Sequence, residues 1–263
     1  MSKGTMMIDK PRISNNNLLD NWCFLNPVNQ RGVSDTILTK GYFIDRWILV
    51  SGSVQLTPDG LLLDGEIQQK LEYSVNRKTS AAVLTTEGVF DAEYNDELKI
   101  FSISATGKTI VAAKLEIGSM QSLAYLNEDN TWVLNDYFDY QAELLKCYRY
   151  YQVLSMYEYN YKFVYGSSGR GFLTVQYNDL ICPMRAVPTM SIQGIINSNG
   201  VDGIIIREDV SNNPKGSLET IEINTRTTYN FYITIRGSNL PADKYTNYLN
   251  AGTNTKIIAD ADI

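Results

Sequence analysis

Short runs of alternating apolar and polar residues, separated by turn signals, are the feature that most constrains this sequence. Lys99–Ser104 is one such run, and others recur between clusters of Gly, Pro, Asn and Asp. Alternation places successive side chains on opposite faces of a strand, so that one face is buried and the other is solvated. Short strands at this spacing are typical of a sandwich or jelly roll. The sequence therefore predicts a mainly β protein.

The clearest hairpin signal is the Pro-Asp-Gly tripeptide at Pro58–Gly60, which has short apolar runs on both sides. Pro presets the backbone of a turn, and Gly accepts conformations that other residues avoid. In the earlier run Gly41–Leu49 we expect Trp47 to point into the core. Further strands are predicted at residues 69–76, 81–86, 89–94, 98–105, 109–117, 152–164, 172–177, 180–182, 191–195, 203–207, 217–224, 229–237 and 257–259.

The most helix-like segment is Asp139–Tyr151. Asp139 can accept hydrogen bonds from the free amides of a first helical turn, and Glu143 adds negative charge there. We predict a short helix that joins two β-rich halves; the alternative is a surface helix packed on one β domain. The apolar face expected to fix this joint comprises Leu144, Cys147, Tyr148 and Tyr151.

These signals divide the 263 residues into four segments. Hydrophobic residues make up 44% of the chain, which suffices for packed cores in two domains of ordinary size. We predict two β-sandwich domains with jelly-roll-like folds, joined by the short α-helix. The segments are an N-terminal arm at 1–16, a first sandwich at 17–137, the linking helix at 138–152 and a C-terminal sandwich at 153–263.

Histidine is absent from the sequence, and this excludes many kinds of site. Its absence removes Ser-His-Asp and Cys-His catalysis and every histidine metal site. The formal net charge of −6, without a long Lys/Arg run, argues against nucleic-acid partners and anionic membranes. No apolar run approaches the roughly 20 residues of a membrane-spanning helix. Cys23, Cys147 and Cys182 lack metal-ligand spacing, so we expect buried free thiols.

Eighteen tyrosines are the main positive feature of the composition. Tyrosine offers a large contact area with a polar tip, which suits sugar faces and protein interfaces. After the helix, alternate tyrosines share one face of a predicted strand, and a Gly/Ser loop follows at 166–171. This face is predicted either to bind a ligand or to pack against another domain or subunit. The candidate ligand-binding residues are Tyr157, Tyr159, Tyr161, Tyr165 and Arg170.

Two other groups of side chains are alternative candidates for a functional site. Trp22, Trp47 and Trp132 would suit a sugar-stacking platform, but tryptophans in a sandwich more often fill the core. The acidic cluster within Asp91–Glu97 supplies carboxylates for a glycoside hydrolase or for calcium, although its spacing matches no EF-hand loop. Solvated turn carboxylates are the favoured interpretation. We therefore predict no catalytic residue, no metal site and no cofactor.

The order of several motifs resembles that of a known family. The motifs are NLLDNWCFLNPVNQRG at Asn17–Gly32, GYFIDRW at Gly41–Trp47, IVAAKLEIGSMQSLAY at Ile110–Tyr125, WVLNDYFDYQAELLKCYRYYQ at Trp132–Gln152 and CPMRAVPTMS at Cys182–Ser191. Together they resemble a β-sandwich module of tail-fibre and other tail-associated proteins from phages and prophages of Gram-positive bacteria. The sequence differs from the family at Tyr148, a position where the family usually has Gln.

This resemblance implies a virion protein that is not an enzyme and whose first domain is similar to carbohydrate-binding modules. It carries over no binding residue. The implied function is a tail-fibre or receptor-binding component that engages host cell-surface polysaccharide. The alternatives are a purely structural baseplate or capsid-attached protein and, less favoured, a polysaccharide depolymerase.

Partners and location follow from the same resemblance. We expect contacts with other virion proteins, a homotrimer such as tail fibres commonly form, and a host cell-wall or surface glycan as ligand. We expect no nucleic-acid partner and no membrane insertion. Met1–Lys10 lacks the apolar core of a signal peptide. The protein is therefore expected to be made in the host cytoplasm and to reside in the virion tail or a surface appendage.

Overall fold

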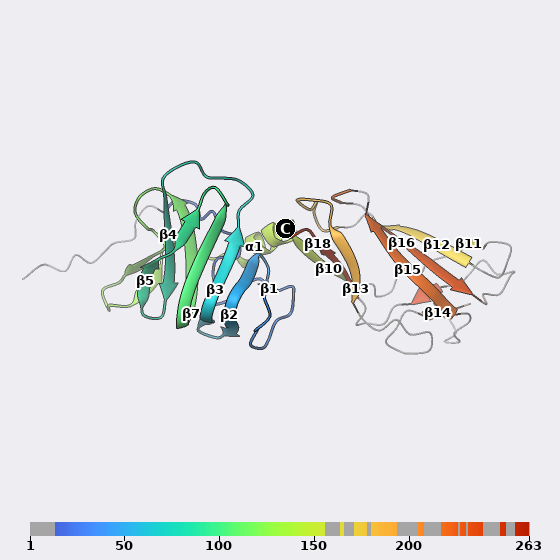
Figure 1. The fold of residues 1–263 in the computed structure, drawn as a ribbon, viewed down its shortest axis with the longest axis horizontal. Coiled ribbons are helices and arrows are strands. Elements are labelled where there is room, and N and C mark those ends of the chain that lie inside the picture. Colours follow the sequence, from blue (N-terminus) through green and yellow to red (C-terminus); the bar gives the residue numbers. More distant parts are fainter. Residues whose placement is uncertain are drawn as a thin grey trace, which may run out of the picture. The chain divides into compact units, whose positions relative to one another are not determined.

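A computed structural model of the chain describes residues 14–155, 164–165, 171–177, 180–193, 205–207, 217–225, 227–229, 231–238, 248–250 and 256–262. Its elements are antiparallel strands and one short helix (Figure 1), which confirms the mainly β prediction. The chain divides into two compact units, Met1–Cys147 and Tyr148–Ile263.

Seven strands of the first unit form one antiparallel sheet, in which β1-β2-β3-β7-β4-β5 lie in this order and β6 also pairs with β7. Figure 1 shows β2, β3, β7 and β4 side by side. The sheet is open, with β1 and β5 at its edges. The strands span Gly41–Ile44 (β1), Trp47–Thr57 (β2), Gly60–Lys70 (β3), Thr79–Thr85 (β4), Gly88–Asp91 (β5), Glu93–Asn95 (β6) and Ile100–Ile117 (β7).

The hairpin predicted at Pro58–Gly60 is confirmed. β2 ends at Thr57 and β3 begins at Gly60, and these two residues face each other across a two-residue turn. Gly60 has a φ of +129°, and a Cβ atom there would lie 2.3 Å from the carbonyl oxygen of Ile110. Since an L side chain tolerates neither the conformation nor the close approach, the turn needs Gly at this position.

The longest strand, β7, corrects the sequence-based division of this region. We predicted separate strands at 98–105 and 109–117, but β7 runs unbroken for 18 residues. Gly107 has a φ of +61° and lies at an irregularity in the pairing with β3. A bulge of this kind takes up an extra residue and bends a strand without ending it. The turn signal at Gly107 therefore produces a bend.

The two edges of β7 have different neighbours. On one edge, β3 pairs with β7 from Ile100 to Ile110, apart from the bulge. On the other edge, β6 pairs with Ile100–Ser102, and β4 pairs from Ile110 to Ile117. Within residues 14–155, no strand pairs with this second edge between Ser102 and Ile110. The sheet is therefore open along the middle of β7 on one side.

Residues before the first strand also pair with β7. Between Leu18 and Phe24, backbone hydrogen bonds of 2.8–2.9 Å join this segment to residues 111–115 of β7. The Asn17 side chain adds a bond from Nδ2 to the carbonyl oxygen of Ala113, at 2.9 Å. The pairing of β3 with β7 ends at Ile110. The NLLDNWCF part of the first motif therefore pairs with the next residues of β7, 111–115.

Large aromatic side chains build the core of the first unit. Trp47, Phe24 and Phe101 are fully buried. The Phe24 and Phe101 rings stand edge-on to Trp47, with centroid distances of 5.1 and 6.1 Å. Trp22 is also buried and stands edge-on to Phe138 at 5.4 Å. The inward position predicted for Trp47 and the core role of Trp22 are confirmed.

The third tryptophan, Trp132, is 37% exposed. It begins β9 (Trp132–Leu134), which pairs with β8 (Ala124–Leu126). Its indole lies against the backbone of Gly88 at the start of β5. Trp132 therefore covers the β4–β5 turn rather than filling the core.

The predicted helix is present but shorter than expected. α1 spans Tyr140–Cys147, and the Asp139 carboxylate caps it by accepting hydrogen bonds from the amides of Gln141 and Ala142. The extension to Tyr151 is wrong. Tyr151 begins the strand β10, because its backbone pairs with β18 near the C-terminus.

The buried face of α1 also differs from the prediction. Glu143 and Cys147 are its buried residues, whereas Leu144 is half-buried. Tyr148 lies beyond the helix and Tyr151 lies in β10, so the four predicted residues do not share one helical face. α1 belongs wholly to the first unit, which ends at Cys147. Its joining role stays a prediction.

The described strands of the second unit form three antiparallel sheets, with the orders β10-β18-β13, β11-β12-β16-β15 and β14-β17. Buried Gln152 ties β10 to the CPM motif, because its side chain bonds the Ile181 amide and the Cys182 carbonyl, each at 2.9 Å. The strands span Tyr151–Ser155 (β10), Val164–Tyr165 (β11), Gly171–Tyr177 (β12), Thr189–Gln193 (β13), Ile205–Arg207 (β14), Ser217–Thr225 (β15), Phe231–Ser238 (β16), Tyr248–Asn250 (β17) and Lys256–Asp260 (β18).

The three cysteines are free thiols, as predicted. Cys23 and Cys147 are buried, and Cys182 is half-buried. Burial raises the pKa of each thiol, and at Cys147 the nearby carboxylates of Asp45 and Asp20 raise the pKa further. These thiols are therefore held in the unreactive protonated form at neutral pH.

Candidate functional site

Polar residues of the first two motifs form a buried network that supports the fold. Asn21 is 0% exposed; its Nδ2 donates to the carbonyl oxygens of Val28 and Asp45, at 2.9 and 2.8 Å. Its Oδ1 accepts from the Val28 amide at 2.7 Å. The Asn21 amide donates to Glu143 Oε2 at 2.6 Å, and its carbonyl accepts from Trp47 Nε1 at 3.0 Å. Asn21 therefore ties together four segments of the first unit.

Arg46 extends this network across the β1–β2 turn. It is 2% exposed and has a φ of +73°, a conformation that disfavours an ordinary side chain. Its Nε donates to Asp20 Oδ2 at 3.2 Å, and its Nη2 donates to the Lys70 carbonyl at 2.6 Å. These bonds offset the backbone strain. The charged residues beside Trp22 and Trp47 are therefore structural.

A second buried group surrounds Lys114 on β7. Lys114 and Glu116 are each 1% exposed. The Lys114 ammonium donates to Ser14 Oγ, to Ser122 Oγ at 3.1 Å and to Asp136 Oδ2 at 2.5 Å. The Glu116 carboxylate accepts from the amide and hydroxyl of Ser122, both at 2.5 Å. This group fastens the start of the described chain and residues 122–136 to β7.

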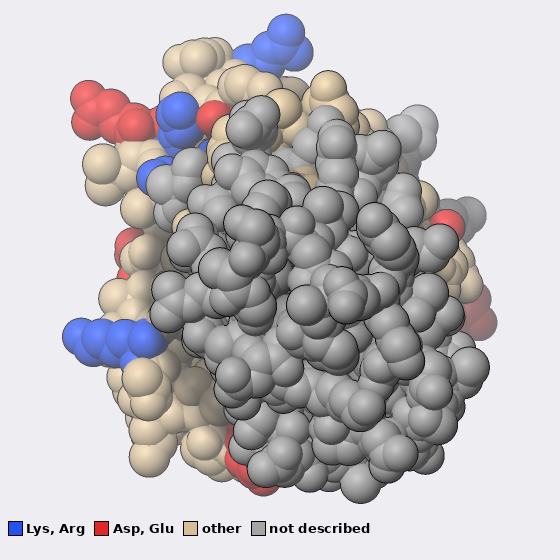
Figure 2. All heavy atoms as spheres, turned by 90° about the vertical axis from the view of Figure 1, so that its right-hand side faces the viewer, with Lys and Arg blue, Asp and Glu red and all other residues tan. Residues whose placement is uncertain are grey.

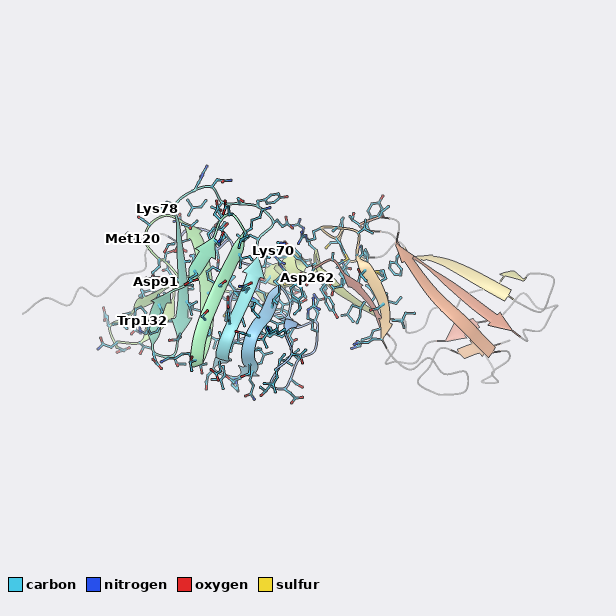
Figure 3. All side chains as sticks on the ribbon, in the orientation of Figure 1. Lys70, Lys78, Asp91, Met120, Trp132 and Asp262 are labelled. Atoms are coloured by element: carbon cyan, nitrogen blue, oxygen red, sulfur yellow. The ribbon has the colours of Figure 1, made fainter. Side chains whose placement is uncertain are left out.

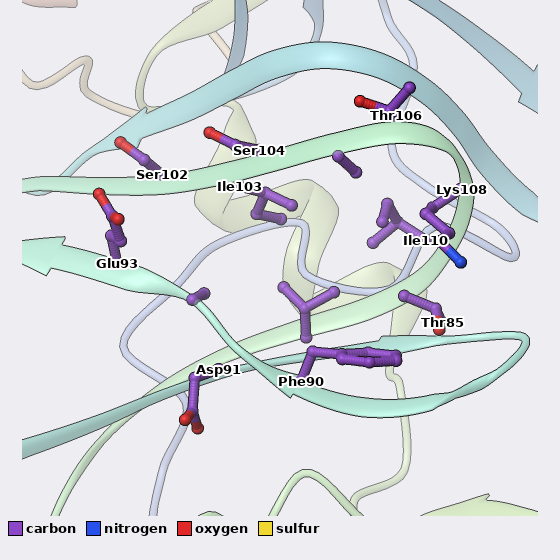
Figure 4. Close-up of a pocket in the computed structure, with 13 residues that line it drawn as sticks. Thr85, Phe90, Asp91, Glu93, Ser102, Ile103, Ser104, Thr106, Lys108 and Ile110 are labelled. Atoms are coloured by element: carbon purple, nitrogen blue, oxygen red, sulfur yellow. The ribbon is translucent and has the colours of Figure 1, made fainter.

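The open edge of β7 borders a cleft of about 430 Å³ (Figure 4). We call it the β7 cleft; its lining comes from residues 83–85 of β4, 90–93 of β5 and β6, and 102–110 of β7. Val83, Ile103 and Ile110 are buried members of the core cluster and line its apolar part. Known ligand pockets have volumes of about 300–1,000 Å³. The β7 cleft is therefore large enough for a small ligand.

An exposed aromatic ring and several polar groups surround this apolar part. Phe90 is 49% exposed and lies opposite Val83 in the β4–β5 pairing. Glu93 lies opposite Ser102 in the β6–β7 pairing, so these two side chains share a face. In Figure 4, β5 and β6 run along one side of the cleft and β7 along the other. Other polar residues that line the cleft are Thr85, Asp91, Ser104, Thr106 and Lys108.

Lys108 is the one cation among the residues that line the β7 cleft. Its ammonium donates to both carboxylate oxygens of Glu87, in an ion pair whose side chains are 40% and 56% exposed. The charge of Lys108 is therefore already balanced. In Figure 4 the Glu93 side chain points toward Ser102, whereas the Asp91 carboxylate points away from the cleft.

The tyrosine face predicted from the sequence is not tested by this structure. Tyr157, Tyr159, Tyr161 and Arg170 lie outside the described residues. The backbone of Tyr165 belongs to β11 and pairs with Gly171 of β12. The ligand-binding role of these five residues stays a prediction.

The structure separates the members of the acidic cluster at Asp91–Glu97. Asp91 and Glu93 border the β7 cleft, and Figure 3 places Asp91 near the β5 edge of the sheet. Asp96 instead accepts hydrogen bonds from the Val75 amide at 2.6 Å and from the Tyr94 hydroxyl at 2.8 Å. No group of three His, Cys, Asp or Glu side chains suited to a metal ion occurs in the described part of the chain.

The Tyr94–Asp96 pair gives a prediction for the alkaline range. Burial, followed by the hydrogen bond to Asp96, raises the pKa of Tyr94 to about 12 from its ordinary value near 10. A raised pKa means that the folded state holds this proton more tightly. The resulting stability is present below about pH 10 and is lost as the pH rises through about 12.

The measurement is a tyrosinate absorbance titration of the wild type minus that of Tyr94→Phe, with circular dichroism to follow the fold. The difference should contain one tyrosine that ionises near pH 12. In Asp96→Asn the corresponding pKa should fall only partly, because burial remains its main cause. A Tyr94 pKa near 10 in the folded wild type would contradict the arrangement.

Sequence reasoning missed most of the β7 cleft. It noted Asp91 and Glu93 but not Phe90 or the hydroxyl groups of β7. The cleft exists because β6 leaves β7 at Ser102 and β4 joins it at Ile110, and no local pattern encodes such a change of partner. The available signal was the alternation of small polar residues at Ser102 and Ser104, which marks a solvated strand face.

Comparison with known proteins adds no identification, because no family model, curated protein or solved structure matches the chain.

None of the described helices is long and apolar enough to cross a membrane. In Figure 2, acidic and basic side chains of the described residues occur together around the visible surface. Our functional proposal rests on the β7 cleft, which lies within the described part of the chain.

Proposed function

We propose that this chain is a tail-associated virion protein whose first unit binds a host-surface polysaccharide in the β7 cleft. The observation that carries the proposal is the half-exposed ring of Phe90 beside hydroxyl and carboxylate groups over an apolar floor. In this proposal the first unit is a jelly-roll-like sandwich similar to carbohydrate-binding modules. The second unit is another β-sandwich.

The chemistry of the cleft suits a sugar better than a wholly apolar ligand. A pyranose ring has an apolar face of C–H groups, which can lie against an aromatic ring such as Phe90. Its hydroxyl groups need hydrogen-bond partners when they leave water. Ser102, Ser104 and Thr106 can donate and accept such bonds, and the carboxylate of Glu93 can accept them.

The wider role rests on the order of the sequence motifs. In this role the protein assembles with other virion proteins as a homotrimer and presents the cleft to the host cell wall. No catalytic step is part of the proposal. Light scattering on the purified chain tests the trimer, and a monomer at high concentration would count against a fibre.

Phe90→Ala should weaken binding to purified host cell-wall polysaccharide about tenfold, because it removes the stacking surface. Tyr73→Ala is the matched control, since Tyr73 is 76% exposed and does not line the cleft. Binding is measured by calorimetry with the full chain. Equal binding by the wild type and Phe90→Ala would place the ligand elsewhere.

Two further outcomes distinguish the alternative functions. If the wild type binds neither intact cell walls nor their polysaccharide, a purely structural role in the baseplate or capsid replaces the proposed one. If the wild type releases reducing ends from the polysaccharide and Asp91→Asn or Glu93→Gln abolishes the release, the protein is a depolymerase.

A further inference from the structure

The backbone of β7 offers hydrogen-bonding groups to the β7 cleft. The Lys99 carbonyl accepts a hydrogen bond from the Leu71 amide, just after β3, and the regular pairing of β3 with β7 continues to Ala105. Backbone groups of successive residues point to opposite edges of a strand, so the odd-numbered residues of this stretch face β3. The amides and carbonyls of Ser102 and Ser104 therefore face the other edge of β7.

Ser104 is the residue of this edge that faces the cleft. Ser102 pairs with β6, and within residues 14–155 no strand pairs with the edge from there to Ile110. After Ala105 the bulge around Gly107 interrupts the strand. Between these limits, Ser104 directs its amide and its carbonyl into the cleft. One residue is too short a stretch for an added strand, since strands usually need three or more, so a small ligand is the better occupant.

A buried apolar floor lies next to the Ser104 amide. Ile103 precedes Ser104 in β7 and lines the cleft together with Val83 and Ile110; these three side chains are at most 4% exposed. Figure 4 shows Ile103 pointing from β7 toward the strand that carries Phe90. A ligand group on this floor must be apolar, whereas a group that accepts from the Ser104 amide must have a lone pair. An acetyl group, a carbonyl with an attached methyl, meets both needs.

We infer that the β7 cleft selects a glycan that contains N-acetylated hexosamine units. The inference rests on the proposed function and names its substrate class. The acetyl oxygen accepts a hydrogen bond from the Ser104 amide, the acetyl methyl lies on the apolar floor, and the sugar ring lies against Phe90. A plain hexose has a hydroxyl group in place of the acetamido group, which leaves the floor uncovered. A protonated free amine can only donate, so it leaves the Ser104 amide without an acceptor.

The test compares three oligomers of equal length by calorimetry with the full chain. They are oligomers of N-acetylglucosamine, of glucose and of glucosamine. The N-acetylglucosamine oligomer should bind about tenfold more tightly than the glucose oligomer, because it adds a hydrogen bond and a buried methyl group. The glucosamine oligomer should bind no better than the glucose oligomer. Tighter binding of either oligomer that lacks acetyl groups would overturn the inference.

Ser104→Pro tests the backbone amide, because proline has no N–H and is tolerated where that group does not face a neighbouring strand. In this variant the N-acetylglucosamine oligomer should bind only as tightly as the glucose oligomer. Ser104→Ala is the matched control, since it removes the hydroxyl group and keeps the amide, and it should keep the preference. Circular dichroism checks the fold of both variants. A preference that persists in Ser104→Pro would mean that another group recognises the acetyl oxygen.

Amide hydrogen exchange in the wild type gives a second measurement, which does not depend on the folding of a variant. At saturation, the N-acetylglucosamine oligomer should slow exchange of the Ser104 amide several-fold more than the glucose oligomer does. Equal exchange rates in the two complexes would contradict the hydrogen bond on which the inference depends.

Other outcomes separate the inference from the function on which it rests. If the host polysaccharide binds through Phe90 but no N-acetylglucosamine oligomer binds, the proposed function stands and the inference is wrong. If the acetylated and glucose oligomers bind equally and Phe90→Ala weakens both, the cleft binds sugar but does not select the acetyl group. If neither the host polysaccharide nor any oligomer binds, the proposed function fails as well.

Discussion

Replacement of Lys114 by Met is expected to destabilise the first unit by about 3–5 kcal/mol, the usual effect of removing one partner from a buried ion pair. Met keeps most of the side-chain volume, so the loss reports on charge rather than on a cavity. Lys114 is 1% exposed and bonds Ser14, Ser122 and Asp136. Without its ammonium group, the buried carboxylate of Glu116, 3.9 Å away, loses its nearest cation.

Lys108→Met is the matched control on the same strand. Lys108 also pairs with a glutamate, but both side chains are largely exposed, so this change should reduce stability by about 1 kcal/mol or less. All three tryptophans lie in the first unit, and their fluorescence therefore follows its unfolding in urea without interference from the second. Similar midpoints for the two variants would show that the Lys114 group contributes little.

Asn21→Ala should have the second largest effect, a loss of about 3 kcal/mol or more in the stability of the first unit. The change leaves the Val28 amide and two backbone carbonyls without their Asn21 partners inside the protein, and each such group costs about 1–3 kcal/mol. The φ of +52° at Asn21 adds strain, because Ala tolerates this region less well than Asn.

Two control variants divide this effect into its parts. Asn130 has a similar φ of +57° but is exposed, so Asn130→Ala should cost only about 1 kcal/mol through the backbone term. Asn21→Gly accepts the positive φ and removes only the side-chain bonds. If urea unfolding of Asn21→Gly matched that of the wild type, the buried bonds would not be the source of stability.

Local chemistry was enough to predict several elements of this fold. The Pro58–Gly60 turn, the start of α1 after Asp139 and the inward position of Trp47 each depend on a few neighbouring residues. The end of α1 was not predictable in the same way. Tyr148 and Tyr151 continue the helical spacing of Leu144 and Cys147, but Tyr151 pairs with a strand near the C-terminus, and this distant partner decides its conformation.

The candidate site was predictable to a smaller degree. The sequence drew attention to the tyrosine face, and it treated the acidic cluster as ordinary turn carboxylates. Phe90 attracted no notice, because its exposure depends on how β5 and β6 pass the open edge of β7. Glu143 was expected to act through the helix dipole, whereas it is buried and accepts a hydrogen bond from Asn21. Both cases depend on contacts between residues far apart in the sequence.

The central place of β7 has a consequence for how the protein is made. β7 is the last of the seven sheet strands to leave the ribosome, yet it pairs with β3, β4, β6 and the segment at Leu18–Phe24. The Asn17–Ala113 bond spans 96 residues. Contacts this distant form slowly, and unpaired strand edges are open to association with other chains until they close. The sheet of the first unit therefore stays incomplete until β7 has left the ribosome, and its folding becomes one late event.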